Sequence, residues 1–158
     1  MQFTVGFLAL ILNLIGYIPY IRDILLHKVK PHRITWGIWT ILTTIAAFNQ
    51  ISNEGGYSSL FFTSTAMLVT IVFVLSFRYG MGGASKIDRL CLFLAILLLI
   101  YWITVQETQL STVLAVIIDA IAAIPTLIKT YRHPETETYI QWCLAGIAGF
   151  LTILAIPR

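Results

Sequence analysis

One acidic side chain, Asp119, lies in the middle of an otherwise uncharged apolar run from Thr108 to Ile128. A carboxylate at the centre of a membrane helix costs roughly 2.5–3.5 kcal/mol on insertion scales, so such residues usually face a protein interior or a water-filled cavity. There Asp119 would bind a cationic or polar group, or carry a coupling proton. The alternative is a buried carboxylate that pairs with a neighbouring helix and serves structure alone.

Three further side chains are predicted to share a substrate site with Asp119. Asn13 lies at the same depth in the first apolar run, and its amide can donate to and accept from a polar group. Trp39 and Trp142 lie deeper than the ends of their runs, where an indole can stack on a planar ligand or a sugar face. Anchoring in the interfacial aromatic belt is the alternative, and it fits the shallower Trp36, a secondary gate candidate.

Two prolines and three polar side chains are candidates for hinges and gates. Pro19 and Pro125 lie near the inner ends of their runs, where a proline either hinges a helix or marks its end. Asn49 and Gln50, at the outer end of the second run, either form an outer gate or simply meet water. Thr63 belongs to a hydroxyl-rich run whose side chains either join helices or hydrogen-bond a solute.

The sequence predicts no enzyme, no cofactor and no metal site. The histidines fall singly in loops, and Cys91 and Cys143 fall inside apolar runs without paired histidines, as packing residues do. The turn at residues 80–83 is glycine-rich but lacks the Lys-Ser/Thr pair of a phosphate-binding loop.

These residues belong to a chain whose composition indicates a membrane protein. Of 158 residues, 58% are hydrophobic and only 11% are charged, against about 25% charged in soluble domains. This disfavours soluble enzymes, nucleic-acid binders and disordered proteins. A spanning helix needs about 20 apolar residues, and the continuous runs predict an all-α polytopic membrane protein. Its six predicted transmembrane helices are 3–21, 34–52, 57–77, 87–105, 110–130 and 138–156.

The distribution of Lys and Arg predicts the orientation in the cell membrane. Nine of the ten basic residues lie in the first, third and fifth loops, whereas the second and fourth loops carry only Glu54 and Glu107. Loops rich in Lys and Arg face the cytoplasm, so both termini of this multi-pass chain are predicted outside. The basic residues then contact the headgroups of the lipid bilayer. No basic soluble face with stacking aromatics is present, so no nucleic-acid partner is expected.

An internal repeat relates the first two predicted helices to the last two. Pro19 and Trp36 recur 106 residues later as Pro125 and Trp142, and no gap is needed between them. The first helix of each copy crosses from outside to inside, so the two copies are parallel. Parallel repeats are a known plan for transporters, with the substrate site between the repeats near mid-membrane.

The repeated segments resemble a known motif. Ile18-Pro19-Tyr20, the basic loop after it and Thr35-Trp36 look like the PQ-loop motif of the SWEET and PQ-loop superfamily of small membrane transporters. The stretch from Ile124-Pro125-Thr126 to Gln141-Trp142 resembles it too. The resemblance covers about half of the chain and implies two parallel three-helix bundles joined by a linker helix.

The chain departs from that plan in two respects. Tyr20 and Thr126 stand where the motif has glutamine, so the role of that glutamine does not carry over. Six predicted helices are one fewer than the plan requires. Either a partner in a homo-oligomer, a dimer, completes the second bundle, or that bundle works incomplete. The predicted parts of the single membrane domain 1–158 are the first bundle 3–77, the linker helix 87–105 and the second bundle 110–156.

Together these features predict a membrane transporter that moves a small polar solute, sugar-like or another small metabolite, by alternating access. The alternative is a non-transporting membrane scaffold or sensor subunit. The surroundings of Asp119 and Asn13 discriminate between the two. If both faced lipid or a solid core, the transport hypothesis would lose its main support.

Overall fold

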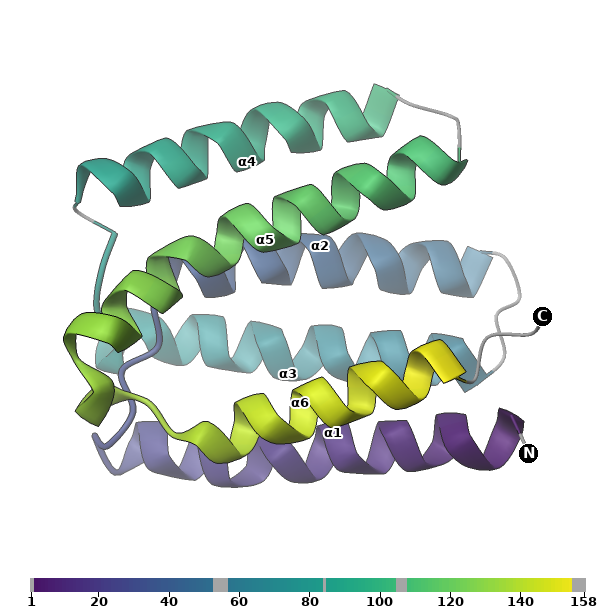
Figure 1. The fold of residues 1–158 in the computed structure, drawn as a ribbon, viewed down its shortest axis with the longest axis horizontal. Helices are drawn as coiled ribbons and strands as arrows, with labels where there is room; N and C mark the ends of the chain where they lie inside the picture. The colour runs from purple at the N-terminus through teal and green to yellow at the C-terminus, as the bar shows by residue number, and fades with distance from the viewer. Residues whose placement is uncertain (1, 53–56, 84, 105–107, 155–158) are drawn as a thin grey trace.

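In a computed structural model, which describes residues 2–52, 57–83, 85–104 and 108–154, the chain is all-helical (Figure 1). The prediction of six helices is confirmed. They are α1 (Gln2–Leu25), α2 (Arg33–Ser52), α3 (Tyr57–Tyr79), α4 (Lys86–Thr104), α5 (Thr108–Arg132) and α6 (Tyr139–Leu154), with a short 3₁₀ helix η1 (Pro134–Thr136) before α6. Some residues named above lie outside the described part of the chain. They are the loop acids Glu54 and Glu107 and the predicted helix ends at 105 and 155–156.

Three of the described helical stretches are long and apolar enough to cross a membrane. They are Ser59–Tyr79, Lys86–Thr104 and Leu110–Arg132. Large apolar side chains on their outer faces are exposed, such as Met67 at 64% and Ile103 at 74%. Contiguous exposed apolar surface is rare on soluble proteins, so these helices indicate an α-helical membrane protein.

Three helices run past the charged residues at which the apolar runs stop. α1 continues to Leu25, α3 to Tyr79 and α5 to Arg132, so the predicted ends at 21, 77 and 130 were too early. A charge ends an apolar run but does not interrupt the backbone hydrogen bonds of a helix. Long basic side chains near a helix end also reach water while their stems stay against apolar surface.

The second helix connects the two parts of the core. α2 packs on α3, α4 and α5, while α1 packs on α3 and α6, and α4 packs on α5. In Figure 1 the helices lie side by side along the long axis, with α4 at one edge and α1 at the other. One buried cluster joins α1, α2 and α3 around Trp36, and a second joins α2, α4 and α5 around Ile118.

The α1–α2 and α3–α4 loops meet at one end of the bundle. The backbone N–H of Met81 donates to the Pro31 carbonyl at 3.1 Å, and the N–H of Arg33 donates to the Met81 carbonyl at 3.3 Å. The Arg33 guanidinium also donates to the carbonyls of Ser76 and Gly80 at the end of α3. Basic side chains stabilise the free carbonyls of a helix C-terminus, so Arg33 holds α3 to the start of α2.

Asp88 lies in the first turn of α4 and connects this helix to the same loops. The Asp88 N–H donates to Ser85 Oγ at 3.0 Å and the Ser85 N–H to Asp88 Oδ2 at 3.2 Å, which is a capping box. The second oxygen, Oδ1, lies 3.4 Å from Nε2 of the buried His32. Gly82 packs on this ring with φ +86°, and a Cβ there would lie 2.0 Å from the same nitrogen. Only glycine fits there.

Burial lowers the pKa of His32 below its usual value, with Asp88 opposing this shift and Lys129 and Arg33 adding to it. The unfolded chain therefore binds a proton at His32 more readily than the folded protein does. We expect the free energy of unfolding to fall as the pH drops below about 6.5 towards the lower pKa of the folded state, with no contribution from His32 above about pH 7. Thermal unfolding in detergent between pH 5 and pH 8 measures this. In the variant His32→Gln, stability should fall less steeply between pH 7 and pH 5. An equal loss of stability in both proteins would show that His32 does not cause it.

Candidate functional site

A cavity of about 880 Å³ lies between α2, α4 and α5. Its volume falls in the range of about 300–1,000 Å³ that small-molecule sites occupy. Aliphatic side chains and Trp102 form much of its wall. The polar and charged side chains that line it are Thr43, Asn49, Gln50, Ser111, Thr112 and Asp119. The structure therefore brings Asp119 together with the two predicted outer-gate residues.

The cavity extends from one end of the bundle towards its middle. Thr112 lies in the second turn of α5, and Asn49 and Gln50 lie near the end of α2 at Ser52. These residues mark the end of the bundle opposite the α1–α2 loop. Asp119 lies about 10 Å further along α5 at a rise of about 1.5 Å per residue. The carboxylate therefore occupies the inner part of the cavity.

The carboxylate of Asp119 is exposed to this cavity and forms no ion pair with a described residue. Trp39 lies near this carboxylate on the side of the aromatic residues described below. The buried indole N–H of Trp39 makes no hydrogen bond within the usual distance and angle limits, but it interacts with Asp119 as a longer-range donor. An unpaired carboxylate in an apolar wall can bind a cation, a hydrogen-bond donor or a proton.

Three indoles pack together between the cavity and the loop end. The ring centroids lie 5.3 Å apart for Trp36 and Trp39, 5.8 Å for Trp39 and Trp142, and 6.5 Å for Trp36 and Trp142. Tyr20 joins them at 5.4 Å from Trp36. Tilted and edge-to-face rings at these distances attract one another beyond their area burial. We call Tyr20 and the three tryptophans the aromatic cluster; its rings contact one another and close the interior here.

A buried ion pair lies on the loop side of the aromatic cluster. Lys129 Nζ binds Glu137 Oε1, and each side chain is only 3% exposed. The Tyr20 hydroxyl donates to Glu137 Oε1 at 3.3 Å, and the Trp142 indole N–H donates to Oε2 at 3.3 Å. Lys129 Nζ also donates to the Lys30 carbonyl at 2.9 Å. The pair therefore connects α1, α5, α6 and the α1–α2 loop.

The backbone of the two loops is joined beside this pair. The Lys30 N–H donates to the Thr136 carbonyl at 3.0 Å, which links the α1–α2 loop to η1. The loop end is thus closed by a layer of charges and backbone hydrogen bonds above a layer of aromatic rings.

Asn13 lies elsewhere in the bundle. Its side chain is buried, and Nδ2 donates to Thr65 Oγ1 of α3 at 2.8 Å. In the described part of the chain no hydrogen bond joins Asn13 to Asp119. The predicted contribution of Asn13 to a substrate site stays a prediction, and the structure gives this amide a packing partner.

Both prolines lie inside continuous helices. α1 runs beyond Pro19 to Leu25, and α5 runs beyond Pro125 to Arg132. Neither proline therefore marks a helix end, which was the alternative to a hinge. Each lacks the backbone N–H that would donate to the carbonyl four residues earlier, so each helix loses one internal hydrogen bond near its loop end. The hinge role itself stays a prediction.

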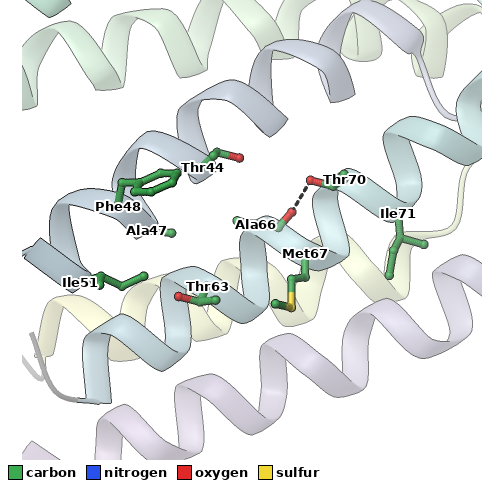
Figure 2. Close-up of a pocket in the computed structure, with 9 residues that line it drawn as sticks. All are labelled: Thr44, Ala47, Phe48, Ile51, Thr63, Ala66, Met67, Thr70 and Ile71. Carbon is green, nitrogen blue, oxygen red and sulfur yellow. Dashed lines mark hydrogen bonds between the residues drawn. The ribbon is translucent and has the colours of Figure 1, made fainter.

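Thr63 lines a different pocket, a groove of about 540 Å³ between α2 and α3 (Figure 2). Its walls are mostly apolar, with Phe48 and Met67 among the larger side chains. The Thr70 hydroxyl in the groove donates to the Ala66 carbonyl of its own helix at 2.7 Å, so it is satisfied without a ligand. The polar cavity at Asp119 is the better candidate for a polar solute.

Sequence reasoning missed the ion pair. Lys129 was counted only as a basic residue of the fifth loop, and Glu137 as one of several loop acids. Lys129 and Glu137 are 8 positions apart, but the end of α5 at Arg132 lies between them, so no helical spacing signals the pair. Tyr20, which also bonds to Glu137, is 117 positions away.

Compared with family models, with curated proteins and with solved structures, this chain has no match.

The ion pair makes a prediction about stability. Removing one member of a buried pair leaves an uncompensated buried charge and costs about 3–5 kcal/mol. We expect Lys129→Met to lower the free energy of unfolding in mixed micelles by about that amount. The double variant Lys129→Met/Glu137→Gln should recover most of the loss, because neither charge remains.

Glu135→Gln is the matched control for this measurement. Glu135 belongs to the same connecting segment but pairs with His133 at the surface, where the side chains are 69% and 51% exposed. Its effect should stay below about 0.5 kcal/mol. A Lys129→Met loss no larger than that of the control would show that the pair does not hold the loop end.

Proposed function

We propose that the chain is a transporter with six membrane-spanning helices that moves a small polar solute by alternating access. The observation that carries the proposal is the asymmetry of the interior. A cavity with an unpaired carboxylate extends from one end, while an aromatic cluster and a buried ion pair close the other. This is the arrangement of a transporter open on one side.

The distribution of basic residues supports an assignment of the two ends of the bundle to the two sides of the membrane. Basic residues gather in the loops at the closed end, and the positive-inside rule assigns such loops to the cytoplasm. In the cell membrane the cavity would then open outward, both termini would lie outside, and the pair Lys129–Glu137 would form the inner closure. Pro19 and Pro125 are positioned to hinge α1 and α5 when that closure opens.

Contacts between residues 106 positions apart support the two parallel repeats. Lys30 and Thr136 differ by this offset, and a backbone hydrogen bond joins them. Trp36 and Trp142 differ by the same offset, and their rings are 6.5 Å apart. Equivalent residues of two copies meet in this way only near a twofold axis that relates the copies.

Contacts away from that axis recur in the same register. The Thr35 hydroxyl of α2 donates to the Ala122 carbonyl of α5 at 2.6 Å. The equivalent positions are Gln141 of α6 and Gly16 of α1, and a Cβ on Gly16 would lie 2.5 Å from Gln141 Oε1. The repeat makes α1 equivalent to α5 and α2 equivalent to α6. The contact of α1 with α6 is therefore equivalent to the contact of α5 with α2, and both contacts are present.

A reversible lock at the closed end tests the proposal. In a background with Cys91→Ser and Cys143→Ser, Lys30→Cys and Thr136→Cys place two thiols on residues already joined by a backbone hydrogen bond. We expect reconstituted protein to move at least one solute from a radiolabelled panel of sugars, amino acids and amines. Oxidation should stop that flux and dithiothreitol should restore it, because the inner closure can no longer open.

Flux that continues when the disulfide is complete would contradict alternating access through this end. Absence of flux for the whole panel, with folded wild-type protein, would favour a non-transporting scaffold or sensor. The variant with only Lys30→Cys is the control for oxidation, since it has no second thiol to pair with.

We also propose a homodimer through α6. In the first repeat Phe73 of α3 packs on Gly37 of α2, where a Cβ would meet the ring at 2.9 Å. The equivalent position on α6 is Cys143, which is exposed. A Cβ on Gly146 or Gly149 would also meet no described atom within 4 Å. A second copy of the chain can pack closely on such a face.

The native thiols test the dimer directly. Cys143 is exposed and Cys91 is buried, so a membrane-permeant oxidant should cross-link two copies through Cys143. We expect a disulfide-linked dimer on a non-reducing gel for wild type and for Cys91→Ser, and only monomer for Cys143→Ser. A cross-link that persists in Cys143→Ser, or none in wild type at high protein density, would place the interface elsewhere.

A further inference from the structure

No described basic side chain pairs with Asp119, and the indole N–H of Trp39 acts on its carboxylate only as a longer-range donor. By contrast, the other described acids each lie beside a basic side chain: Asp23, Asp88, Glu135 and Glu137. The described lining of the cavity contains no lysine, arginine or histidine. A carboxylate in an apolar surrounding is stable only when a proton, a cation or strong donors compensate its charge.

The wall around Asp119 suits an organic cation better than a metal ion. Metal ions of the hard type require several oxygen ligands, and no group of three His, Cys, Asp or Glu side chains occurs in the described residues. The cavity offers one carboxylate and otherwise neutral side chains: the hydroxyls and amides of Thr43, Asn49, Gln50, Ser111 and Thr112, with aliphatic side chains and Trp102. A cation with apolar substituents loses little hydration there and gains contact with the wall.

Aromatic rings strengthen this preference. Trp102 lines the cavity, and Trp39 borders Asp119 from the side of the aromatic cluster. Indole faces attract ammonium groups through the ring quadrupole, and quaternary ammonium ligands are commonly bound in this way. An acidic residue beside indoles thus selects positive charge, and it disfavours both anions and neutral solutes of equal shape.

We infer that the cavity between α2, α4 and α5 is a binding site for a monovalent organic cation, with Asp119 as its counter-ion, Trp102 as its aromatic wall and Trp39 as a donor that orients Asp119. The inference deepens the proposed transport function, because it names the class of solute that the cavity accepts. As a binding site it can be tested without any flux.

Choline and its neutral isostere 3,3-dimethylbutan-1-ol are a matched pair of probes, since they differ by one charge and hardly in shape. Titration calorimetry on the full chain in nanodiscs at pH 8 should show binding of choline but not of the alcohol. Asp119→Asn should weaken choline binding by about tenfold or more, as loss of a charge-assisted contact does. Trp102→Leu should weaken it too, and Trp102→Phe less so, because phenylalanine keeps an aromatic ring in the wall.

Glu135→Gln removes an equal charge outside the cavity and should leave choline affinity unchanged. A melting curve for each variant separates loss of binding from loss of fold. Equal binding of choline and the alcohol, or full choline affinity in Asp119→Asn, would overturn the inference. No choline binding by folded wild type would overturn it as well, leaving a proton as the charge that compensates Asp119.

The two proposals fail separately. Flux of neutral solutes without choline binding would keep the transporter and reject the cation site. Choline binding that depends on Asp119, without flux of any solute in the panel, would keep the cation site and reject the transporter.

Discussion

Burial of Lys129 together with Glu137 is the interaction on which the closed end of this protein depends. A single buried charge costs several kcal/mol, and mutual attraction offsets this only when the remaining donors and acceptors are satisfied. Here Tyr20, Trp142 and the Lys30 carbonyl provide those contacts. In the proposed transport cycle, separation of the loops would expose both charges to water at once. An intermediate with one charge buried and unpaired would be costly.

Contacts of the aromatic cluster connect the ion pair to the cavity. Trp142 bonds to Glu137 and packs at a tilt against Trp39, and Trp39 acts on Asp119. A change in the position of α6 at the loop end would therefore move the wall beside the carboxylate. Conversely, a solute that draws Trp39 towards Asp119 alters the packing that supports the ion pair. These contacts run from Glu137 through two rigid indole rings to Asp119. Rigid rings favour two discrete packing arrangements over a continuous series.

The sequence predicted the helices but not their neighbours. Continuous apolar runs specify six helices, and the acid inside one of them, Asp119, lines a cavity together with hydroxyl and amide side chains. Lateral order could not be predicted, because lipid tails and helix faces are equally apolar and the runs carry no strong preference for either. Asn13 and Asp119 occupy equivalent positions in sequence, yet Asn13 bonds to Thr65 of α3 while Asp119 faces α2 and α4. The contacts of Glu137 depend on tertiary packing, which local spacing does not encode.

The tryptophans have a spectroscopic consequence. The chain has four of them; Trp102 lines the cavity and Trp36, Trp39 and Trp142 belong to the aromatic cluster. No indole therefore emits from a remote surface or loop. The intrinsic fluorescence of the protein arises wholly from the cavity wall and the rings that close it, with excitation energy shared among three indoles in contact. The emission maximum and anisotropy of unlabelled protein thus report on whether water has entered that layer.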